Sequence, residues 1–126
     1  MEPVEYGQLR LVSSDSRRDI REFSFKKSNV ILIVVKDGSK PIGQHFHRKV
    51  VETFCLLEGG GIVRTVDLNQ KGEPIGKTQT FALYPGFVIR IPPYQAHRFD
   101  LEAGTRMLMF ASRPFDAEDL IACPIS

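Results

Sequence analysis

Short runs of strand-forming residues, separated by turn residues, repeat along all 126 residues of this chain and restrict what it can fold into. Each run is bounded by Gly, Pro, Asn or Asp, which is the pattern of strands joined by turns. We find no convincing long segment with the periodicity of an amphipathic helix. The sequence therefore predicts an all-β sandwich or barrel. The predicted strands are residues 8–12, 20–25, 30–36, 43–47, 52–57, 61–68, 77–83, 87–91, 96–101 and 105–111.

Three segments are predicted to be hairpin turns. Residues 59–61 are consecutive glycines, which adopt positive φ without a steric penalty from a Cβ. Residues 69–76 are polar and rich in Gly and Pro, so they predict an exposed loop. Residues 100–104 are predicted to close a third hairpin. Near the end of the chain, Asp116 is a candidate cap for a short helical turn.

The length predicts a single domain over residues 1–126, because single cores commonly span about 100 to 200 residues. A hydrophobic content of 42% and a charged content of 25% are typical of ordinary soluble globular proteins. The 17 basic and 15 acidic residues are scattered along the chain, so there is little long-range electrostatic field to attract nucleic acid. We therefore expect no nucleic-acid partner.

The first residues are acidic and lack the basic start and apolar stretch of a secretory signal. The longest purely aliphatic run, residues 30–35, is far shorter than the roughly 20 residues that cross a bilayer. These features predict a cytoplasmic protein without a membrane partner.

All three histidines of the chain fall within two short patterns. His45 and His47 are two residues apart, so on a strand both imidazoles project from the same face. Glu52 has the opposite parity and reaches that face only if residues 48–51 form a turn or bulge. His97 opens the strand that follows a proline stop, and it can return toward the pair.

Three imidazoles and one carboxylate form a donor set suited to a divalent transition metal such as zinc, iron, nickel or manganese. Such a set leaves coordination positions open to water or substrate. The alternative is that each histidine is a hydrogen-bonded core residue, which is the usual role of a lone histidine on an apolar face. The joint occurrence of both patterns in a β-rich chain favours the metal site.

Together the two patterns resemble those of the cupins, a family of small metal-binding β-barrels. The first reads His-x-His-x4-Glu with Gly59 closing it, and the second reads Gly86-x5-Pro92-x4-His97. The resemblance implies a cupin fold, which is a double-stranded β-helix or jelly-roll barrel. Carried over to this sequence, the implied metal ligands are His45, His47, Glu52 and His97.

A narrower resemblance links residues 43–47, 54–64 and 111–116 to the cupin domain of bacterial capsule-pathway epimerases, which act on nucleotide sugars. It implies a metal-dependent isomerase or epimerase acting on a carbohydrate or nucleotide-sugar intermediate. Tyr94 departs from the family, which often has glycine there. Its phenol is predicted either to lie near the pocket mouth or only to reshape the turn.

Within that function, Tyr94 is a candidate proton donor and Glu52 a candidate base, if Glu52 is not bound to the metal. Polar side chains close to the two patterns are candidates to bind the substrate. These candidates are Gln44, Lys49, Arg64, Arg90 and Gln95.

Two other functions are compatible with the sequence. The same ligand set can hold iron, which predicts a dioxygenase of a small molecule as an alternative. A barrel can also enclose a small ligand without doing chemistry. In either case we expect a homodimer, because exposed edge strands of small barrels are often covered by a second copy.

Overall fold

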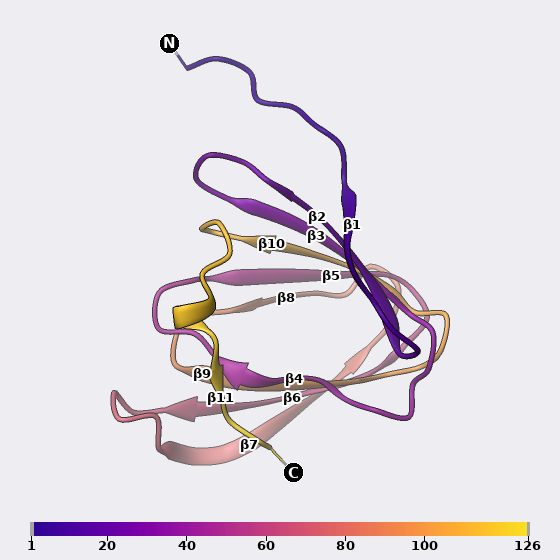
Figure 1. Cartoon of the computed structure of the whole chain (residues 1–126). Helices are drawn as coiled ribbons and strands as arrows, with labels where there is room; N and C mark the ends of the chain where they lie inside the picture. Colours follow the sequence, from indigo (N-terminus) through magenta and orange to yellow (C-terminus); the bar gives the residue numbers. More distant parts are fainter. Residues whose placement is uncertain (1, 126) are drawn as a thin grey trace.

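The computed structural model describes residues 2–125, so the ends of the predicted domain, residues 1 and 126, lie outside the described residues (Figure 1). The chain is almost entirely β-strand. The strands are β1 (Arg10–Ser14), β2 (Arg18–Ser24), β3 (Asn29–Val35), β4 (Ile42–Phe46), β5 (Glu52–Glu58), β6 (Gly61–Leu68), β7 (Pro74–Leu83), β8 (Val88–Ile91), β9 (Gln95–Leu101), β10 (Arg106–Ala111) and β11 (Ile121–Ala122), with a short 3-10 helix η1 (Ala117–Asp119) before β11.

The strands form two antiparallel sheets that face each other (Figure 1). The first sheet has the order β1-β2-β3-β10-β5-β8, and the second has the order β11-β4-β9-β6-β7. Strands that follow one another in the sequence often lie in different sheets, as in a jelly roll. Over residues 2–125, no helix is long and apolar enough to cross a membrane.

The main hydrophobic core lies between the two sheets. Alternate residues point inward, so Phe54 and Leu56 of β5 meet Phe99 and Leu101 of β9 in this core. A second, smaller cluster buries Phe46 together with residues of β6 and β9 and the segment near residue 125. Because Phe46 packs in this second cluster, its neighbours at 45 and 47 are free to face the barrel interior.

All ten predicted strands are present, and their ends differ from the predicted ones by three residues at most. The helical turn predicted near Asp116 is also present as η1, and the Asp116 carboxylate accepts a hydrogen bond from the N–H of Glu118 at 3.0 Å. The short strand β11 was not predicted, because its two residues are too few to show a periodic pattern.

Two of the three predicted hairpins are wrong. Strands β6 and β7 do pair through a tight turn, but the turn covers only residues 69–73, since β7 already begins at Pro74. Residues 59–61 and 100–104 instead carry the chain from one sheet to the other. Local sequence specifies that the chain turns there, whereas the partner of each strand depends on how both sheets bury their apolar faces.

The sheet crossing at residues 59–61 brings two backbones close together. Gly61 has φ of 144°, and a Cβ at this position would overlap the carbonyl oxygen of Asp100. Gly59 has φ of 90°, and a Cβ there would lie 2.7 Å from the Cα of Thr105. Glycine is required here for close approach and not only for conformational freedom.

We expect Gly61→Ala to lower the free energy of unfolding by about 2 kcal/mol or more, because both the backbone conformation and the space exclude a Cβ. Gly104→Ala is the matched control, since Gly104 also has positive φ but faces open space. Its cost should be about 1 kcal/mol. Denaturant unfolding of both variants tests this, and equal losses would contradict it.

Candidate metal centre

A bulge at the start of β4 sets the position of the first histidine. Gly43 and Gln44 both have positive φ, at 96° and 61°, and the register against β9 shifts between Gly43 and His45. A Cβ on Gly43 would lie 2.8 Å from the carbonyl oxygen of His97, so glycine permits the close approach. Beyond the bulge, His45 lies directly opposite His97 on β9.

Strand β4 ends before β5 begins, and a loop joins them, as the parity of Glu52 predicted. Residues 47–51 belong to neither strand, and β5 begins at Glu52 in the other sheet. Glu52 therefore approaches the histidines from the opposite side of the barrel. The predicted break over residues 48–51 is confirmed.

The four residues converge on one point. One ligand atom from each of His45, His47, Glu52 and His97 lies within 4.8 Å of all the others. Oε1 of Glu52 is 3.1 Å from Nε2 of His47 and 3.4 Å from Nε2 of His97. Since metal bonds to such atoms are about 2.0 to 2.2 Å long, two ligands of one ion lie at most about 4.4 Å apart. The group needs to contract by only a few tenths of an ångström to hold an ion.

Unpaired polar atoms within this group support the fit. Nδ1 of His47 lies 2.7 Å from the carbonyl oxygen of Asp119, so in the neutral ring it donates there and leaves the lone pair of Nε2 facing Glu52. Nε2 of His47 and Oε1 of Glu52 are both buried without a hydrogen-bond partner among the described residues. Buried polar atoms are rarely left so, and a cation between them would satisfy both.

The electrostatics of the group favour cation binding. Burial, aided by the charge of His97, lowers the pKa of His45 to about 4, and burial also lowers the pKa of His97. Burial opposes the charged form of Glu52, but contact with His47 and the nearby histidines outweighs it and lowers its pKa. At neutral pH two imidazoles are therefore neutral and the carboxylate is ionised, which are the forms that bind a metal. Burial lowers the pKa of His47, but the Glu52 carboxylate and Asp119 outweigh it and raise that pKa.

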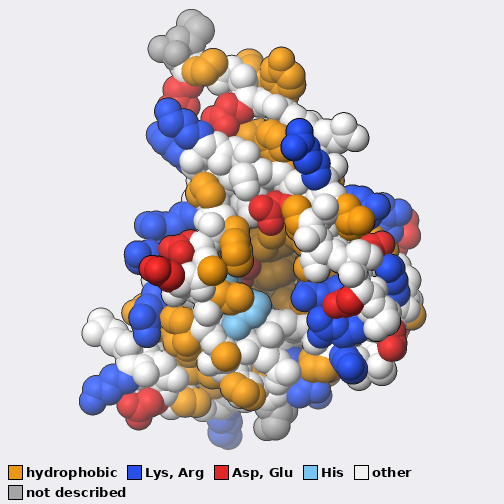
Figure 2. All heavy atoms as spheres, viewed as in Figure 1, with side chains coloured by type: hydrophobic (Ala, Val, Ile, Leu, Met, Phe, Trp, Pro, Cys, Tyr) orange, Lys and Arg blue, Asp and Glu red, His pale blue; other side chains and the backbone are white. Residues whose placement is uncertain are grey.

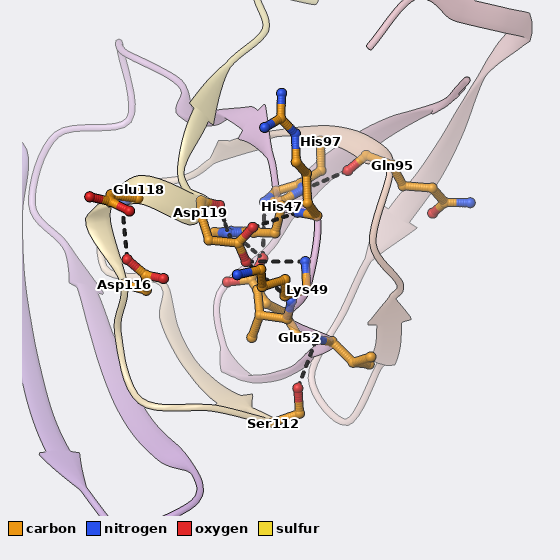
Figure 3. Close-up of polar contacts among 12 residues, drawn as sticks. His47, Lys49, Glu52, Gln95, His97, Ser112, Asp116, Glu118 and Asp119 are labelled. Atoms are coloured by element: carbon orange, nitrogen blue, oxygen red, sulfur yellow. Dashed lines mark hydrogen bonds and ion pairs between the residues drawn. The ribbon is translucent and has the colours of Figure 1, made fainter. Parts of the chain in front are cut away.

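A second-sphere residue, Asp119 of η1, holds the loop that carries His47 (Figure 3). Its carboxylate accepts hydrogen bonds from the backbone N–H groups of Arg48, Lys49 and Val50 at 2.8, 3.2 and 3.2 Å. Its carbonyl oxygen orients the ring of His47 at the same time. No sequence pattern indicates this role, because an aspartate in a short polar segment is usually exposed.

The candidate metal centre lies in a cavity of about 240 Å³ between the two sheets. Figure 2 shows one hollowed face of the molecule, where hydrophobic side chains line the hollow and histidine is visible at its side. Aliphatic and aromatic side chains form most of the walls. They are Ile20, Ile31, Ile33, Ile42, Phe54, Phe99, Met109, Phe115 and Leu120, and the guanidinium of Arg18 joins them.

Most of the predicted substrate-binding residues lie elsewhere. Arg64 pairs with Asp100 at 2.9 Å, and the side chain of Arg90 is exposed on β8. The amide of Gln95 donates to the carboxylate of Asp67. None of these three lines the 240 Å³ cavity. Strand alternation places Arg90 outside, since its neighbour Ile91 is buried.

Two further candidates lie closer to the metal ligands. Gln44 forms part of the β4 bulge, and its carbonyl oxygen accepts a hydrogen bond from the N–H of Cys123 at 2.8 Å. Lys49 is exposed and borders a smaller cavity of about 50 Å³ that also contacts His47 and Glu52. Neither residue lines the larger cavity. Their roles in binding remain predictions.

Tyr94 packs away from the cavity. Its ring lies 6.0 Å from that of Phe46, within the second hydrophobic cluster. Its φ of 60° and the 2.8 Å hydrogen bond from its N–H to the carbonyl oxygen of His47 show how it shapes the turn before β9. Of the two placements predicted for Tyr94, the structure has the one that reshapes the turn, and it does not bring the phenol to the metal ligands.

No protein-family model matches this sequence, and no curated protein matches it. Solved structures do resemble it. CapF, a capsular polysaccharide assembling protein from Staphylococcus aureus, matches with a TM-score of 0.79 and 20% identity over 95% of this chain and 33% of CapF. The chain has a cupin fold. The predicted likeness to a capsule-pathway cupin is confirmed as well. The present chain spans about a third of the length of CapF.

Two other solved structures are similar. The 3,4-ketoisomerase QdtA from Thermoanaerobacterium thermosaccharolyticum, in complex with TDP, has a TM-score of 0.61 and 26% identity over 73% of this chain and 63% of its own. Pac13 from Streptomyces, a nucleoside dehydratase solved with uridine, has a TM-score of 0.69 and 14% identity over 100% of this chain and 95% of its own. At such low identities, the likeness to CapF and Pac13 establishes the fold alone.

We expect Asp119→Ala to weaken the binding of a divalent metal by about tenfold to a hundredfold, because outer-sphere partners of metal ligands commonly contribute that much. The loop N–H groups would lose their acceptor while all four ligands remain. Calorimetric titration of metal-free protein with Zn²⁺ measures the change in affinity.

Asp116→Ala is the matched control, since the Asp116 carboxylate caps the same 3-10 helix but, among the described residues, accepts no hydrogen bond from the loop. It should leave zinc affinity within a few fold of that of the unmodified protein. His97→Ala should remove tight binding altogether. Equal affinities for Asp119→Ala and the unmodified protein would show that the loop needs no such support.

Proposed function

We propose that this cupin is a metal-dependent isomerase or epimerase that acts on a carbohydrate or nucleotide-sugar intermediate. The observation that carries the proposal is the convergence of the half-buried His45 and His47 with the buried Glu52 and His97 at a cavity whose walls are mostly apolar. A metal site that merely supports a fold is usually closed by its protein ligands, whereas a catalytic site keeps positions open. Here the ligands adjoin the cavity, so a bound molecule can reach the ion.

The names of the similar proteins support this class of substrate. QdtA is a 3,4-ketoisomerase and was solved with TDP, and Pac13 is a nucleoside dehydratase solved with uridine. CapF assembles capsular polysaccharide. Fold likeness alone does not transfer a reaction, so the site chemistry must support it independently.

A divalent ion in this site would supply a Lewis acid that polarises a carbonyl group. The protein would supply the proton transfers. If one oxygen of Glu52 is free of the ion, Glu52 removes the proton beside the carbonyl, and the electron pair moves to the carbonyl oxygen. Return of the proton by Glu52 to a neighbouring atom gives isomerisation, whereas epimerisation needs a second group, on the opposite face, that donates a proton. The apolar walls keep bulk water from the reacting carbon.

We expect the metal-loaded protein to exchange deuterium from solvent into the carbon beside the keto group of a nucleotide-linked ketosugar, as followed by NMR. Chelation of the metal should abolish this exchange. Glu52→Gln should slow it by at least about a hundredfold, since general-base catalysis commonly contributes that much or more. The matched control is Glu73→Gln, because Glu73 is exposed in the β6–β7 turn region and should have no effect.

Exchange that survives chelation would count against the proposal. Elemental analysis of protein purified without an affinity tag distinguishes it from the alternatives. Zinc or nickel would support proton-transfer chemistry, whereas iron with oxygen consumption would support the dioxygenase. If His97→Ala left ligand affinity and turnover unchanged, the non-catalytic barrel would be the better description.

We also infer that two copies associate through the edge of the first sheet. Strand β1 is at that edge, and all five of its residues are exposed. Leu11 and Val12 are 53% and 56% exposed, and an uncovered edge of this kind invites pairing with another strand. A homodimer would cover it.

Light scattering on the purified protein should give twice the chain mass. Leu11→Lys combined with Val12→Lys should shift the protein to the monomer, since charges on an edge strand oppose pairing. Ser13→Lys, on the same exposed strand, is a control that adds charge without removing an apolar side chain. A monomeric unmodified protein would contradict the inference.

A further inference from the structure

Arg18 is the first residue of β2, and its side chain lies on the inner face of the first sheet. The next inward residue on the same strand, Ile20, pairs with the buried Ile33, and Arg18 itself pairs with the buried Val35. Arg18 lines the 240 Å³ cavity together with the candidate metal ligands. It faces that cavity from the first sheet, whereas His45 and His97 belong to the second sheet. A cation thus lies within the cavity, apart from the ligands.

The guanidinium of Arg18 has no partner among the described residues. Its Nε is buried without a hydrogen bond, and no ion pair involves its side chain. The nearest acids in the sequence are committed elsewhere. Asp15 pairs with Arg17 at 3.0 Å, and Asp19 pairs with Lys36 at 3.0 Å. Of the residues that line the cavity, only Glu52 carries a carboxylate, and it belongs to the metal centre.

A partly buried guanidinium without an ion-pair partner among the described residues calls for a physical explanation. Burial and the neighbouring charge of Arg17 lower the pKa of Arg18 and outweigh the opposing charge of Asp15, so the site disfavours the charge that it holds. Arginine stays protonated even so, because its ordinary pKa is far above neutral. Its planar fork of N–H donors matches the two oxygens of a carboxylate or a phosphoryl group. An anion from solution would both pair the charge and satisfy the buried donor.

We propose that this cavity binds a substrate that carries an oxyanion, either a phosphoryl group or a carboxylate, and that Arg18 holds this group. The cavity is smaller than the roughly 300 to 1,000 Å³ typical of drug-sized ligands, so it accepts about one sugar ring and not an entire nucleotide sugar. The oxyanion therefore lies at Arg18, and the attached ring extends toward the metal ligands. This orientation rests on the proposed function, whereas the binding of the anion by Arg18 does not.

Calorimetric titration of metal-free protein, kept in chelator, tests the binding step without requiring catalysis. The probes are two matched pairs of anion and neutral molecule: uridine diphosphate with uridine, and glucuronate with glucose. We expect at least one anion to bind about tenfold to a hundredfold more tightly than its neutral partner. Uridine diphosphate would identify the group as a nucleoside diphosphate, and glucuronate would identify it as a sugar carboxylate.

Arg18→Gln should remove this preference for the anion. Arg17→Gln is the matched control, because it removes the same charge one residue away. The Arg17 side chain pairs with Asp15 and does not line the cavity. Arg17→Gln should keep the preference. Arg18→Lys retains the charge and loses the planar fork, so it should weaken the binding of the anion severalfold. This variant tests the proposal even if Arg18→Gln fails to fold.

A preference for the anion that persists in Arg18→Gln, or that is undiminished in Arg18→Lys, would overturn the proposal, as would equal binding of anion and neutral partner by the unmodified protein. The proposed reaction has a separate readout. Loss of deuterium exchange with intact, Arg18-dependent anion binding would reject the isomerase but retain the anion site. Intact deuterium exchange without Arg18-dependent anion binding would reject the anion site but retain the isomerase.

Discussion

The hydrogen bonds between the Asp119 carboxylate and the loop after β4 are the contact on which the geometry of the candidate metal centre depends. At this loop the chain leaves one sheet and enters the other, so three backbone N–H groups lack the partners that a strand would supply. One buried carboxylate satisfies all three. The loop can then deliver His47 and Glu52 from different sheets to the same point.

The centre also depends on where the protein leaves polar atoms unpaired. Most buried groups near it have partners. Among residues 2–125, however, Nε2 of His47 and Oε1 of Glu52 face each other without a hydrogen-bond partner, and Nε of Arg18 has none in the same cavity. The first two atoms call for a cation and the third for an anion. In an apolar cavity these unmet interactions are strong, because little water competes with them. The unsatisfied groups therefore favour a cation at His47 and Glu52 and an anionic group at Arg18.

The sequence was sufficient for the strands and for the four candidate ligands that converge, and insufficient for much of what surrounds them. Strand parity predicted both the shared face of His45 and His47 and the break before Glu52, because side-chain alternation is a local property. The polar residues near the motifs were harder to place. Arg90 and Tyr94 are close to the ligands in sequence but point away from the cavity, since outward alternation places one and a left-handed turn places the other.

Arg18 and Asp119 show the complementary failure. Each is far from the histidines in sequence, and each reaches the centre only through sheet pairing or through the return of the chain after β10. Arg18 lies two residues before the predicted strand 20–25, and it shares a face with Ile20 only because β2 begins at Arg18. Nothing local distinguishes Asp119. Its role depends on tertiary contacts, which sequence patterns do not encode.

The long sequence separation between Asp119 and its loop bears on the order in which the molecule assembles. Asp119 is 71 residues from Arg48, and contacts between such distant residues pay a large loop-closure entropy, so they tend to form late. The hairpins β1–β2, β2–β3 and β6–β7 join neighbouring residues and carry no such cost. The barrel wall can therefore be built while the loop is still free. On this reasoning the metal centre is among the last parts of the protein to mature, and the local stability of residues 48–50 sets how long it persists.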